Sequence, residues 1–136
     1  MPVHLFTYGT LMLPEVWEAV VSNRYISEIA FLSNHQRFTV RNEVYPGLRY
    51  LNGCTVQGIV YFDISSDDLH RLDAFEGEAY QRSEVRLVVD SNKNITAETY
   101  LVKNEYLGIL SKEVWTTELL NKGGLARFLE GYQGWI

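Results

Sequence analysis

The chain has 136 residues, of which 46% are hydrophobic and 13% aromatic, so we expect one folded domain over residues 1–136 rather than a disordered segment. The net charge is −5 and Lys and Arg form no block, which argues against a nucleic-acid partner. No apolar run approaches the ~20 residues that span a bilayer, so we expect no membrane association.

The N-terminal segment is predicted to be a strand followed by a turn and a helix. A buried strand is expected over Val3–Tyr8, and the residues before it lack the features of a signal peptide. A turn follows at Gly9–Leu13. Pro14 then opens a helix at its first position, where a missing N–H costs nothing, and the helix is expected to run to about Asn23.

The turn before this helix is a candidate anion site. Leu13 offers no side-chain acceptor for the first N–H groups of the helix, and anions favour such a position. Gly9 would let the backbone approach a ligand closely, and Thr10 adds a hydroxyl donor. The alternative is that Gly9 serves only the turn and that water fills the donors.

The middle of the chain is rich in strands. Four are predicted, at Ile26–Leu32, Arg37–Arg41, Gly47–Leu51 and Cys54–Ile64. Asn52-Gly53 is typical of a tight hairpin turn between the last two. Cys54 is the one cysteine, so an internal disulfide is excluded and a reducing compartment, the cytoplasm, is expected. In a strand we expect it to be a buried small hydrophobe.

A short helix is predicted between Ser65 or Ser66, which caps it, and Gly77, which ends it. Leu69 and Leu72 define its apolar stripe, and Glu76 continues that stripe four residues further on. An inward-facing carboxylate at the negative end of the helix dipole has a raised pKa, which suits a general base near neutral pH.

A second interpretation of Glu76 stays open. Helix ends fray, and a terminal glutamate can swing out into water. Spacing along one helix cannot separate this arrangement from an inward-facing base.

The C-terminal part adds two strands, Ser83–Val89 and Thr96–Val102, and then a helix over Ser111–Leu120. A further helical stripe, interpreted as core packing, follows at Leu125, Phe128, Leu129 and Tyr132. Hairpin-connected strands without βαβ alternation predict an α+β domain. We expect a small, curled or barrel-like mixed sheet flanked by helices.

Two motifs in this order resemble a known family. Tyr8-Gly9-Thr10-Leu11 after an N-terminal strand is similar to the opening signature of the gamma-glutamylcyclotransferase-like proteins. The segment from Leu72 to Arg82 resembles their second signature, Leu-Asp-x-x-Glu-Gly-x-x-Tyr-x-Arg. Tyr45-Pro46-Gly47-Leu48 is similar to the Pro-containing strand between them, so the resemblance covers essentially the whole chain.

The resemblance implies a small mixed barrel and an activity, the cyclisation of a gamma-glutamyl amide or peptide that releases 5-oxoproline and a free amine. It implies that Glu76 is the catalytic acid/base and that the backbone of Tyr8, Gly9, Thr10 and Leu11 holds the glutamyl group.

Tyr80 and Arg82 complete the expected substrate-binding residues. Arg82 could instead pair with Glu76, Glu78 or Asp73, and Glu78 is expected to be solvated. No cofactor or metal is expected, because cyclisation requires none and His4, His35 and His70 are too scattered along the sequence for a metal site.

Two further functions stay open. One is a catalytically silent module that binds a small amino-acid-like ligand, and the other is hydrolysis of a related amide. Retention of Glu76 favours the enzyme, because a binder does not need a base at an unfavourable helix end. Neither the leaving amine nor the oligomeric state can be deduced from the chain.

Overall fold

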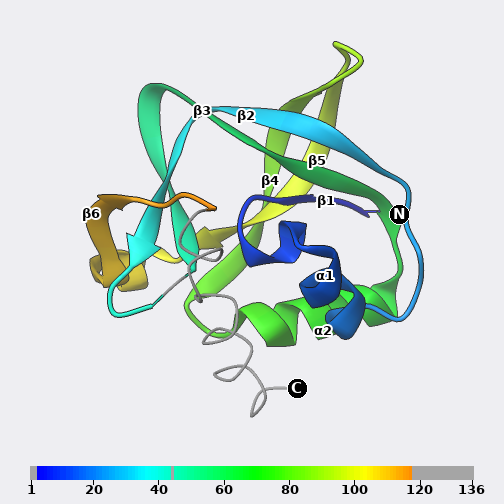
Figure 1. Cartoon of the computed structure of the whole chain (residues 1–136), viewed down its shortest axis with the longest axis horizontal. Helices are drawn as coiled ribbons and strands as arrows, with labels where there is room; N and C mark the ends of the chain where they lie inside the picture. The colour runs from blue at the N-terminus through cyan, green and yellow to red at the C-terminus, as the bar shows by residue number, and fades with distance from the viewer. Residues whose placement is uncertain (1–2, 44, 118–136) are drawn as a thin grey trace.

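Five strands close into a mixed barrel in the computed structural model, which describes residues 3–43 and 45–117 (Figure 1). The strands are β1 (Val3–Thr7), β2 (Ser27–Val40), β3 (Pro46–Ile64), β4 (Tyr80–Val89), β5 (Asn94–Val102) and β6 (Leu110–Val114). The order is β3-β1-β5-β4-β2, β2 returns to pair with β3, and β6 adds to β2. Only the β1–β5 pairing is parallel among these strands. The predicted α+β barrel is confirmed.

Two α-helices pack against each other below the barrel in the view of Figure 1. They are α1 (Pro14–Val20) and α2 (Ser66–Glu76), and two short 3₁₀ helices, η1 (Thr10–Met12) and η2 (Asn104–Ile109), complete the described elements. Pro14 occupies the first turn of α1, as predicted, but the helix ends at Val20 rather than near Asn23. Within the described residues, no helix has the length and apolar character needed to cross a membrane.

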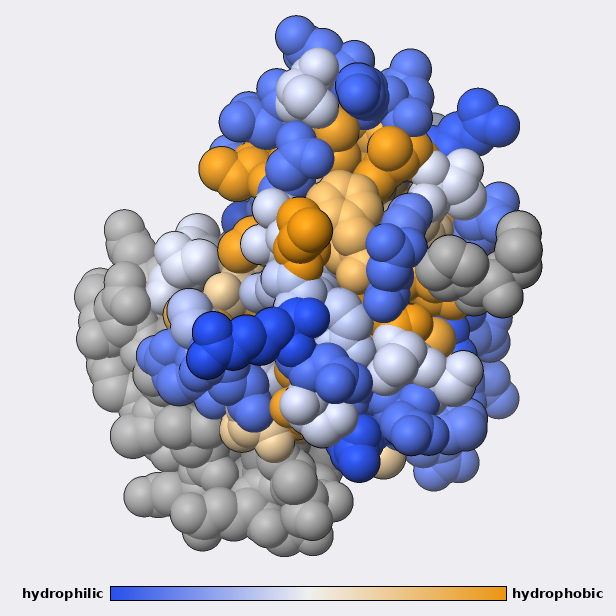
Figure 2. Space-filling model, turned by 90° about the vertical axis from the view of Figure 1, so that its right-hand side faces the viewer, coloured by the Kyte–Doolittle hydropathy of each residue, from blue (hydrophilic) through white to orange (hydrophobic). Residues whose placement is uncertain are grey.

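Successive residues of β1 supply two separate cores, because neighbouring side chains of a strand point to opposite faces. Phe6 belongs to a cluster that draws on all five barrel strands and fills the barrel. Leu5 belongs to a cluster that includes Trp17 of α1 and Leu72 of α2 and joins the helices to the barrel wall. On the face shown in Figure 2, hydrophilic side chains surround a group of apolar ones.

The β2–β3 hairpin corrects the predicted strand boundaries. The predicted hairpin turn at Asn52-Gly53 is wrong, because β3 runs through it and the chain reverses at residues 41–45 instead. Ser33 pairs with Thr55 and His35 with Tyr50, so Asn34 alone faces residues 51–54.

This irregularity is a bulge that uses the local turn chemistry without ending the strand. Asn34 and Gly53 both adopt left-handed backbone angles, with φ of 59° and 89°, and the Gly53 N–H donates to Asn34 Oδ1 over 3.1 Å. The Asn-Gly signal therefore marks a bend in a long paired ribbon. Cys54 lies in this bulge and is only half-buried, which corrects its expected burial.

The segment predicted as the helix Ser111–Leu120 forms the strand β6 over its first residues, so this prediction is wrong for 111–114. Leu110 pairs with Val40 and Val114 with Phe38, and pairing with the edge of β2 outweighs the helical pattern. The later part of that prediction, and the stripe from Leu125 to Tyr132, lie outside the described residues.

A buried carboxylate joins α2 to the segment that follows α1. Asp68 is completely buried, and its oxygens accept hydrogen bonds from the Ser22 N–H (2.8 Å), the Tyr25 hydroxyl (2.6 Å) and Arg71 (2.8 Å). Burial alone would raise the pKa of Asp68, but these hydrogen bonds outweigh it and hold the pKa well below its usual range. The segment after Val20 leaves the helix to make these contacts.

We predict that Asp68→Ala lowers the free energy of unfolding by about 3–5 kcal/mol, because several buried donors lose their charged partner. Since its pKa is depressed, the contribution of Asp68 is present above about pH 4 and is lost as pH falls. Urea unfolding of both proteins at pH 7 and pH 3 should therefore show a difference that shrinks at pH 3. Asp67→Ala, on the exposed side of the same helical turn, is the control and should cost less than about 1 kcal/mol.

Candidate active site

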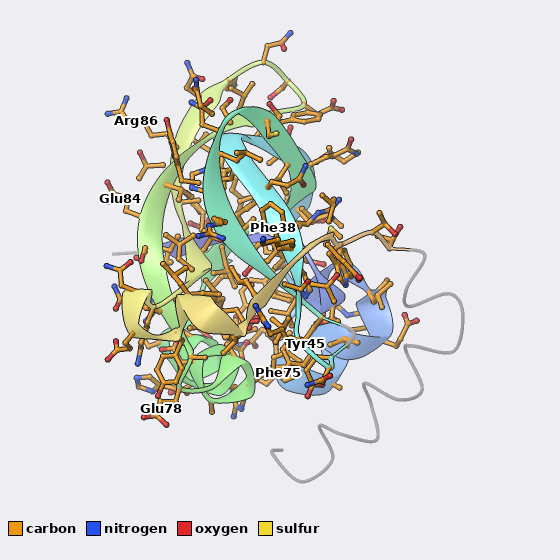
Figure 3. All side chains as sticks on the ribbon, turned by 90° about the vertical axis from the view of Figure 1, so that its left-hand side faces the viewer. Phe38, Tyr45, Phe75, Glu78, Glu84 and Arg86 are labelled. Carbon is orange, nitrogen blue, oxygen red and sulfur yellow. The ribbon has the colours of Figure 1, made fainter. Side chains whose placement is uncertain are left out.

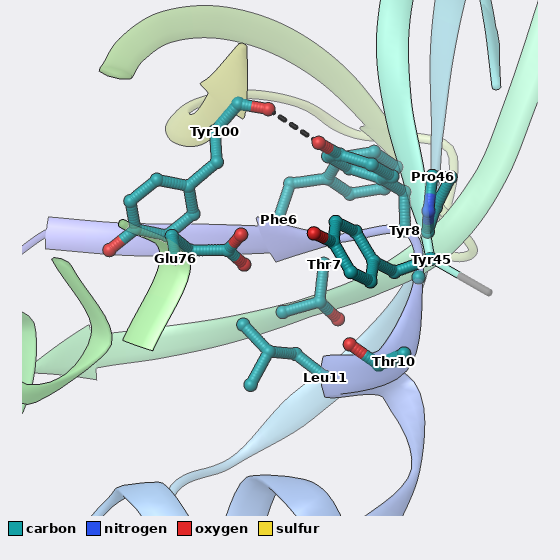
Figure 4. Close-up of a pocket in the computed structure, with 10 residues that line it drawn as sticks. Phe6, Thr7, Tyr8, Thr10, Leu11, Tyr45, Pro46, Glu76 and Tyr100 are labelled. Atoms are coloured by element: carbon teal, nitrogen blue, oxygen red, sulfur yellow. Dashed lines mark hydrogen bonds between the residues drawn. The ribbon is translucent and has the colours of Figure 1, made fainter. Parts of the chain in front are cut away.

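The helix α2 carries Glu76 into a pocket of the barrel wall (Figure 4). The helix begins where the Ser65 hydroxyl caps the Asp68 N–H, and it ends at Gly77, whose φ is 87°, as the sequence predicts. Leu69 and Leu72 bury the inner face of the helix. Glu76 lies on the same face at the last helical position, so its carboxyl enters the pocket instead of swinging out into water.

The pocket lies between the end of β1, the start of β3, β5 and the end of α2. Its empty space is about 350 Å³, a volume that includes the solvent at its mouth. The lining residues are Phe6, Thr7, Tyr8, Gly9, Thr10, Leu11, Tyr45, Pro46, Glu76 and Tyr100. Glu76 is the only one of them with a carboxylate, and none carries a positive charge.

The Glu76 carboxyl has an environment that favours its protonated form. Among the described residues, no side chain forms an ion pair with it or donates a hydrogen bond to it. Burial, with the negative charge of Asp73 as a second cause, raises the pKa of Glu76 to about 8. A carboxyl with this pKa can accept and release a proton near neutral pH.

The turn from Tyr8 to Leu11 forms the wall that faces Glu76. The Tyr8 hydroxyl donates to the Tyr100 carbonyl over 2.6 Å, and the Tyr8 carbonyl accepts from Arg37 Nη1 over 2.9 Å. Within the described part of the chain we find no acceptor for the N–H groups of Gly9, Thr10 and Leu11. Backbone donors on three lining residues are therefore available to a ligand.

Gly9 has a different local role from the one expected. A Cβ at this position would lie 2.8 Å from Cδ and Cγ of Pro46, so the space beside Gly9 is taken by the proline ring rather than by a ligand. This space was expected to receive a ligand, and the close approach of two chain segments fills it instead. The Pro46 carbonyl in turn accepts a hydrogen bond from the Tyr80 hydroxyl over 2.9 Å.

Two of the expected substrate-binding residues, Tyr80 and Arg82, do not line the pocket. Tyr80 is buried behind Pro46. Arg82 donates through Nε and Nη2 to the two oxygens of Asp73, at 2.7 and 3.2 Å, and through Nη1 to Glu98. Of the three pairings of Arg82 considered from the sequence, with Glu76, Glu78 or Asp73, the structure shows the one with Asp73.

Glu78 is exposed, as expected for a solvated residue, and its side chain projects outward in Figure 3. In the same view Tyr45 lies inside the molecule, where it packs against the core cluster that contains Phe75. The lining residues that were not predicted as site residues are Phe6, Thr7, Tyr45, Pro46 and Tyr100. The place of Tyr100 could have been predicted from the sequence, because a β4–β5 hairpin that turns at residues 90–94 places Tyr100 opposite Arg82.

The barrel, the turn after its first strand and the inward carboxylate define a class of small barrel domains, and comparisons with known proteins give its family. The family model "Gamma-glutamyl cyclotransferase, AIG2-like" matches residues 5–117, and the chain belongs to this family. Among curated relatives it is similar to AIG2-like protein C of Arabidopsis thaliana, with 37% identity over 103 residues. It is also similar to AIG2-like protein D of the same plant, with 30% identity over 99 residues.

These relatives are longer than the chain. The matched segments make up 74% and 71% of the chain, but only 59% and 65% of the two relatives. Among solved structures, an Arabidopsis thaliana protein has a TM-score of 0.70 and 26% identity, with 96% of this chain and 88% of that one covered. A gamma-glutamyl cyclotransferase has a TM-score of 0.66 and 18% identity, with 100% and 89% covered, and shows the shared fold.

We predict that Gly9→Ala destabilises the protein by about 1–3 kcal/mol, because the added methyl group forces Pro46 and the turn apart. Thermal unfolding measures the loss. Gly108→Ala is the matched control, since a Cβ there meets nothing within 4 Å, and its melting temperature should stay close to wild type. Equal melting temperatures for Gly9→Ala and wild type would contradict the packing seen at Pro46.

Proposed function

We propose that the protein catalyses intramolecular cyclotransfer on a gamma-glutamyl amine or peptide, releasing 5-oxoproline and a free amine, with Glu76 as general acid/base. The observation that carries this proposal is the Glu76 carboxyl, which has no side-chain partner among the described residues and a pKa raised to about 8. It faces three lining residues whose backbone donors have no acceptor within the described chain. Membership of the cyclotransferase family supports the reaction class.

The chemistry requires one proton to move from one nitrogen to another. The neutral alpha-amine of the substrate attacks its own side-chain carbonyl carbon, and a C–N bond forms. Ionised Glu76 accepts the proton that this amine must lose and donates it to the departing nitrogen as the old amide C–N bond breaks. The carboxylate is regenerated and no other reactant is consumed.

Ring closure gains much of its rate from conformation. Amine and carbonyl belong to one molecule, so a pocket that holds the compact rotamer lowers the barrier by restricting freedom before the reaction. The apolar walls formed by Leu11, Pro46 and the ring of Tyr100 suit the methylene groups of a glutamyl chain.

The backbone of Gly9, Thr10 and Leu11 is the proposed site for negative charge. Because no Lys or Arg of the described residues lines the pocket, these N–H groups are the donors that would bind the alpha-carboxylate of the substrate or the oxyanion that develops on the attacked carbonyl. The Tyr8 hydroxyl is already bonded to Tyr100, so its proposed part is to hold the turn in place.

The substrate is identified by incubating the protein with a panel of gamma-glutamyl amines and gamma-glutamyl dipeptides and measuring 5-oxoproline by mass spectrometry. Release from at least one member, without release from alpha-linked isomers, is the expected result. Binding of panel members without product at any pH from about 5 to 9 would instead support a silent binding module, and free glutamate as the product would support hydrolysis.

We predict that Glu76→Gln lowers kcat at least about 10²-fold, because the amide keeps the shape of the side chain but cannot carry the proton. The assay is release of 5-oxoproline from the best substrate of the panel. Glu78→Gln removes a carboxylate two residues away on the exposed surface and should retain wild-type turnover. A Glu76→Gln variant with normal turnover would show that Glu76 has only a structural role.

The raised pKa of Glu76 predicts two opposite pH dependences. Since the ionised form accepts the first proton, kcat/KM should increase with pH along a limb whose apparent pKa is about 8. Stability should change in the other direction, because unfolding releases the Glu76 proton between the unfolded pKa near 4.5 and the folded value of about 8. The wild type therefore loses stability over this window as pH rises.

Chemical unfolding of wild type and Glu76→Gln between pH 4 and 9 measures this effect. As pH rises from about 4.5 to 8, the free energy of unfolding of the Gln variant should increase relative to wild type by a few kcal/mol. The upper limit is about 1.4 kcal/mol for each unit of difference between the folded and unfolded pKa values of Glu76. A constant difference across the window would contradict the raised pKa.

A further inference from the structure

Asp73 lies one helical turn before Glu76 on α2, so the two carboxylates are neighbours on one side of the helix. Like charges at this spacing repel, and two ionised carboxylates would oppose each other here. Only one of them has partners: Asp73 accepts three hydrogen bonds, from Arg82 Nε, Arg82 Nη2 and the Tyr100 hydroxyl, whereas Glu76 accepts none from the described side chains.

The partners of Asp73 come from the barrel strands behind the pocket. Arg82 is on β4 and Tyr100 is opposite it on β5, so the carboxylate joins α2 to both strands. The Tyr100 hydroxyl donates to Asp73 Oδ1 over 2.6 Å, and Figure 4 shows that this hydroxyl is directed away from the Glu76 carboxyl. The same residue receives the Tyr8 hydroxyl on its carbonyl, at the far side of the pocket.

We propose that Asp73 is a positioning residue for the reaction: held by Arg82 and Tyr100, it keeps a negative charge one turn from Glu76 and keeps the Tyr100 hydroxyl off the Glu76 carboxyl. This inference deepens the proposed function, because it rests on Glu76 being the proton-transferring group. The bidentate pair of hydrogen bonds from Arg82 fixes the position of the Asp73 carboxylate.

The charge of Asp73 and the absence of a side-chain donor among the described residues act on Glu76 in the same direction. A donor bonded to the Glu76 carboxylate would stabilise the ionised form, as Tyr25 and Arg71 do for Asp68 on the same helix. By accepting the Tyr100 hydroxyl, Asp73 keeps that donor from the Glu76 carboxylate. Its own charge then adds to burial, and Asp73 is the charged group that raises the pKa of Glu76.

Among the described residues, the other ionisable groups around Glu76 are mainly tyrosines. Tyr8 after β1, Tyr45 before β3 and Tyr100 of β5 line the pocket, and the buried Tyr80 of β4 lies within electrostatic range of Glu76. Burial, with the hydrogen bond to Asp73, raises the pKa of Tyr100 far above its usual value, so it stays protonated as a donor.

The remaining charges of the described residues do not line the pocket. Glu43, in the turn before β3, is exposed and acts on Tyr80. Arg82 is shared between Asp73 and Glu98. Asp73 is therefore the charge whose removal should change the proton affinity of Glu76 most.

The test is a ¹³C NMR titration of the Glu76 side-chain carboxyl in the full chain, with Asp73→Asn as the main variant. The amide can still accept the Tyr100 hydroxyl but carries no charge, so we expect the Glu76 titration midpoint to fall by about one pH unit or more. The apparent pKa of the acidic limb of kcat/KM should decrease by the same amount. Glu98→Gln is the matched control, because it removes the same charge from the other side of Arg82, and its midpoint should stay near wild type.

Two further variants complete the design. Asp73→Glu restores the charge and should keep the Glu76 midpoint raised. Arg82→Gln leaves Asp73 without its cation and should move the Glu76 midpoint to higher pH. This variant tests the role of the Asp73 charge if Asp73→Asn fails to fold. A midpoint unchanged in both Asp73→Asn and Arg82→Gln, or moved equally in Glu98→Gln, overturns the proposal.

This experiment separates the inference from the proposed function. The titration needs no substrate, so a midpoint that falls in Asp73→Asn supports the role of Asp73 even if the panel yields no 5-oxoproline. Product release with an unchanged midpoint and an unchanged acidic limb would retain the reaction and refute the positioning role.

Discussion

The hydrogen bond between the Tyr8 hydroxyl and the Tyr100 carbonyl is the contact on which the geometry of the site depends. It fastens the turn after β1 to β5, so the lining residues Gly9, Thr10 and Leu11 keep a fixed place relative to the strand opposite. Tyr100 in turn binds Asp73 on α2, the helix that carries Glu76. Two short hydrogen bonds of one tyrosine, through its carbonyl and its hydroxyl, thereby fix the positions of the two sides of the pocket relative to each other.

Two carboxylates on α2 show how local donors decide the charge of a buried acid. Asp68 and Glu76 both lose hydration, and burial alone disfavours the ionised form of each. Asp68 recovers its stabilisation through donors from Ser22, Tyr25 and Arg71, so it remains an anion and serves as a structural anchor. Glu76 receives no such donor from the described residues, so its proton is held until mildly alkaline pH. One helix thus carries a permanent charge at its start and a titrating group at its end.

Local signals were sufficient for the elements next to the site. The cap at Ser65, the stripe of Leu69 and Leu72 and the stop at Gly77 predicted α2 and the direction of Glu76, because helix periodicity ties a side chain to a face without knowledge of the rest of the fold. Pro14 likewise predicted the start of α1.

Features that depend on distant pairing could not be read in the same way. The Asn52-Gly53 pair has the chemistry of a turn, but whether it reverses the chain or bends a paired strand depends on Asn34, nineteen positions away. The segment at 111–114 became a strand because β2 offers it an edge. Tyr100 and Pro46 joined the site only through strand register and barrel closure, and Gly9 gained its role only when Pro46 was placed beside it.

The contact between Arg37 and Trp115 has a consequence for where a working unit of this chain can end. The Arg37 guanidinium lies 5.1 Å from the centre of the Trp115 ring, and its Nη1 donates to the Tyr8 carbonyl. The backbone N–H of Trp115 donates to the backbone carbonyl of Arg37. The completely buried indole therefore supports, from behind, the arginine that holds the pocket turn. A fragment that stops before this tryptophan keeps all five barrel strands, yet it loses the brace of the turn from Tyr8 to Leu11, so the pocket wall depends on residues beyond the barrel.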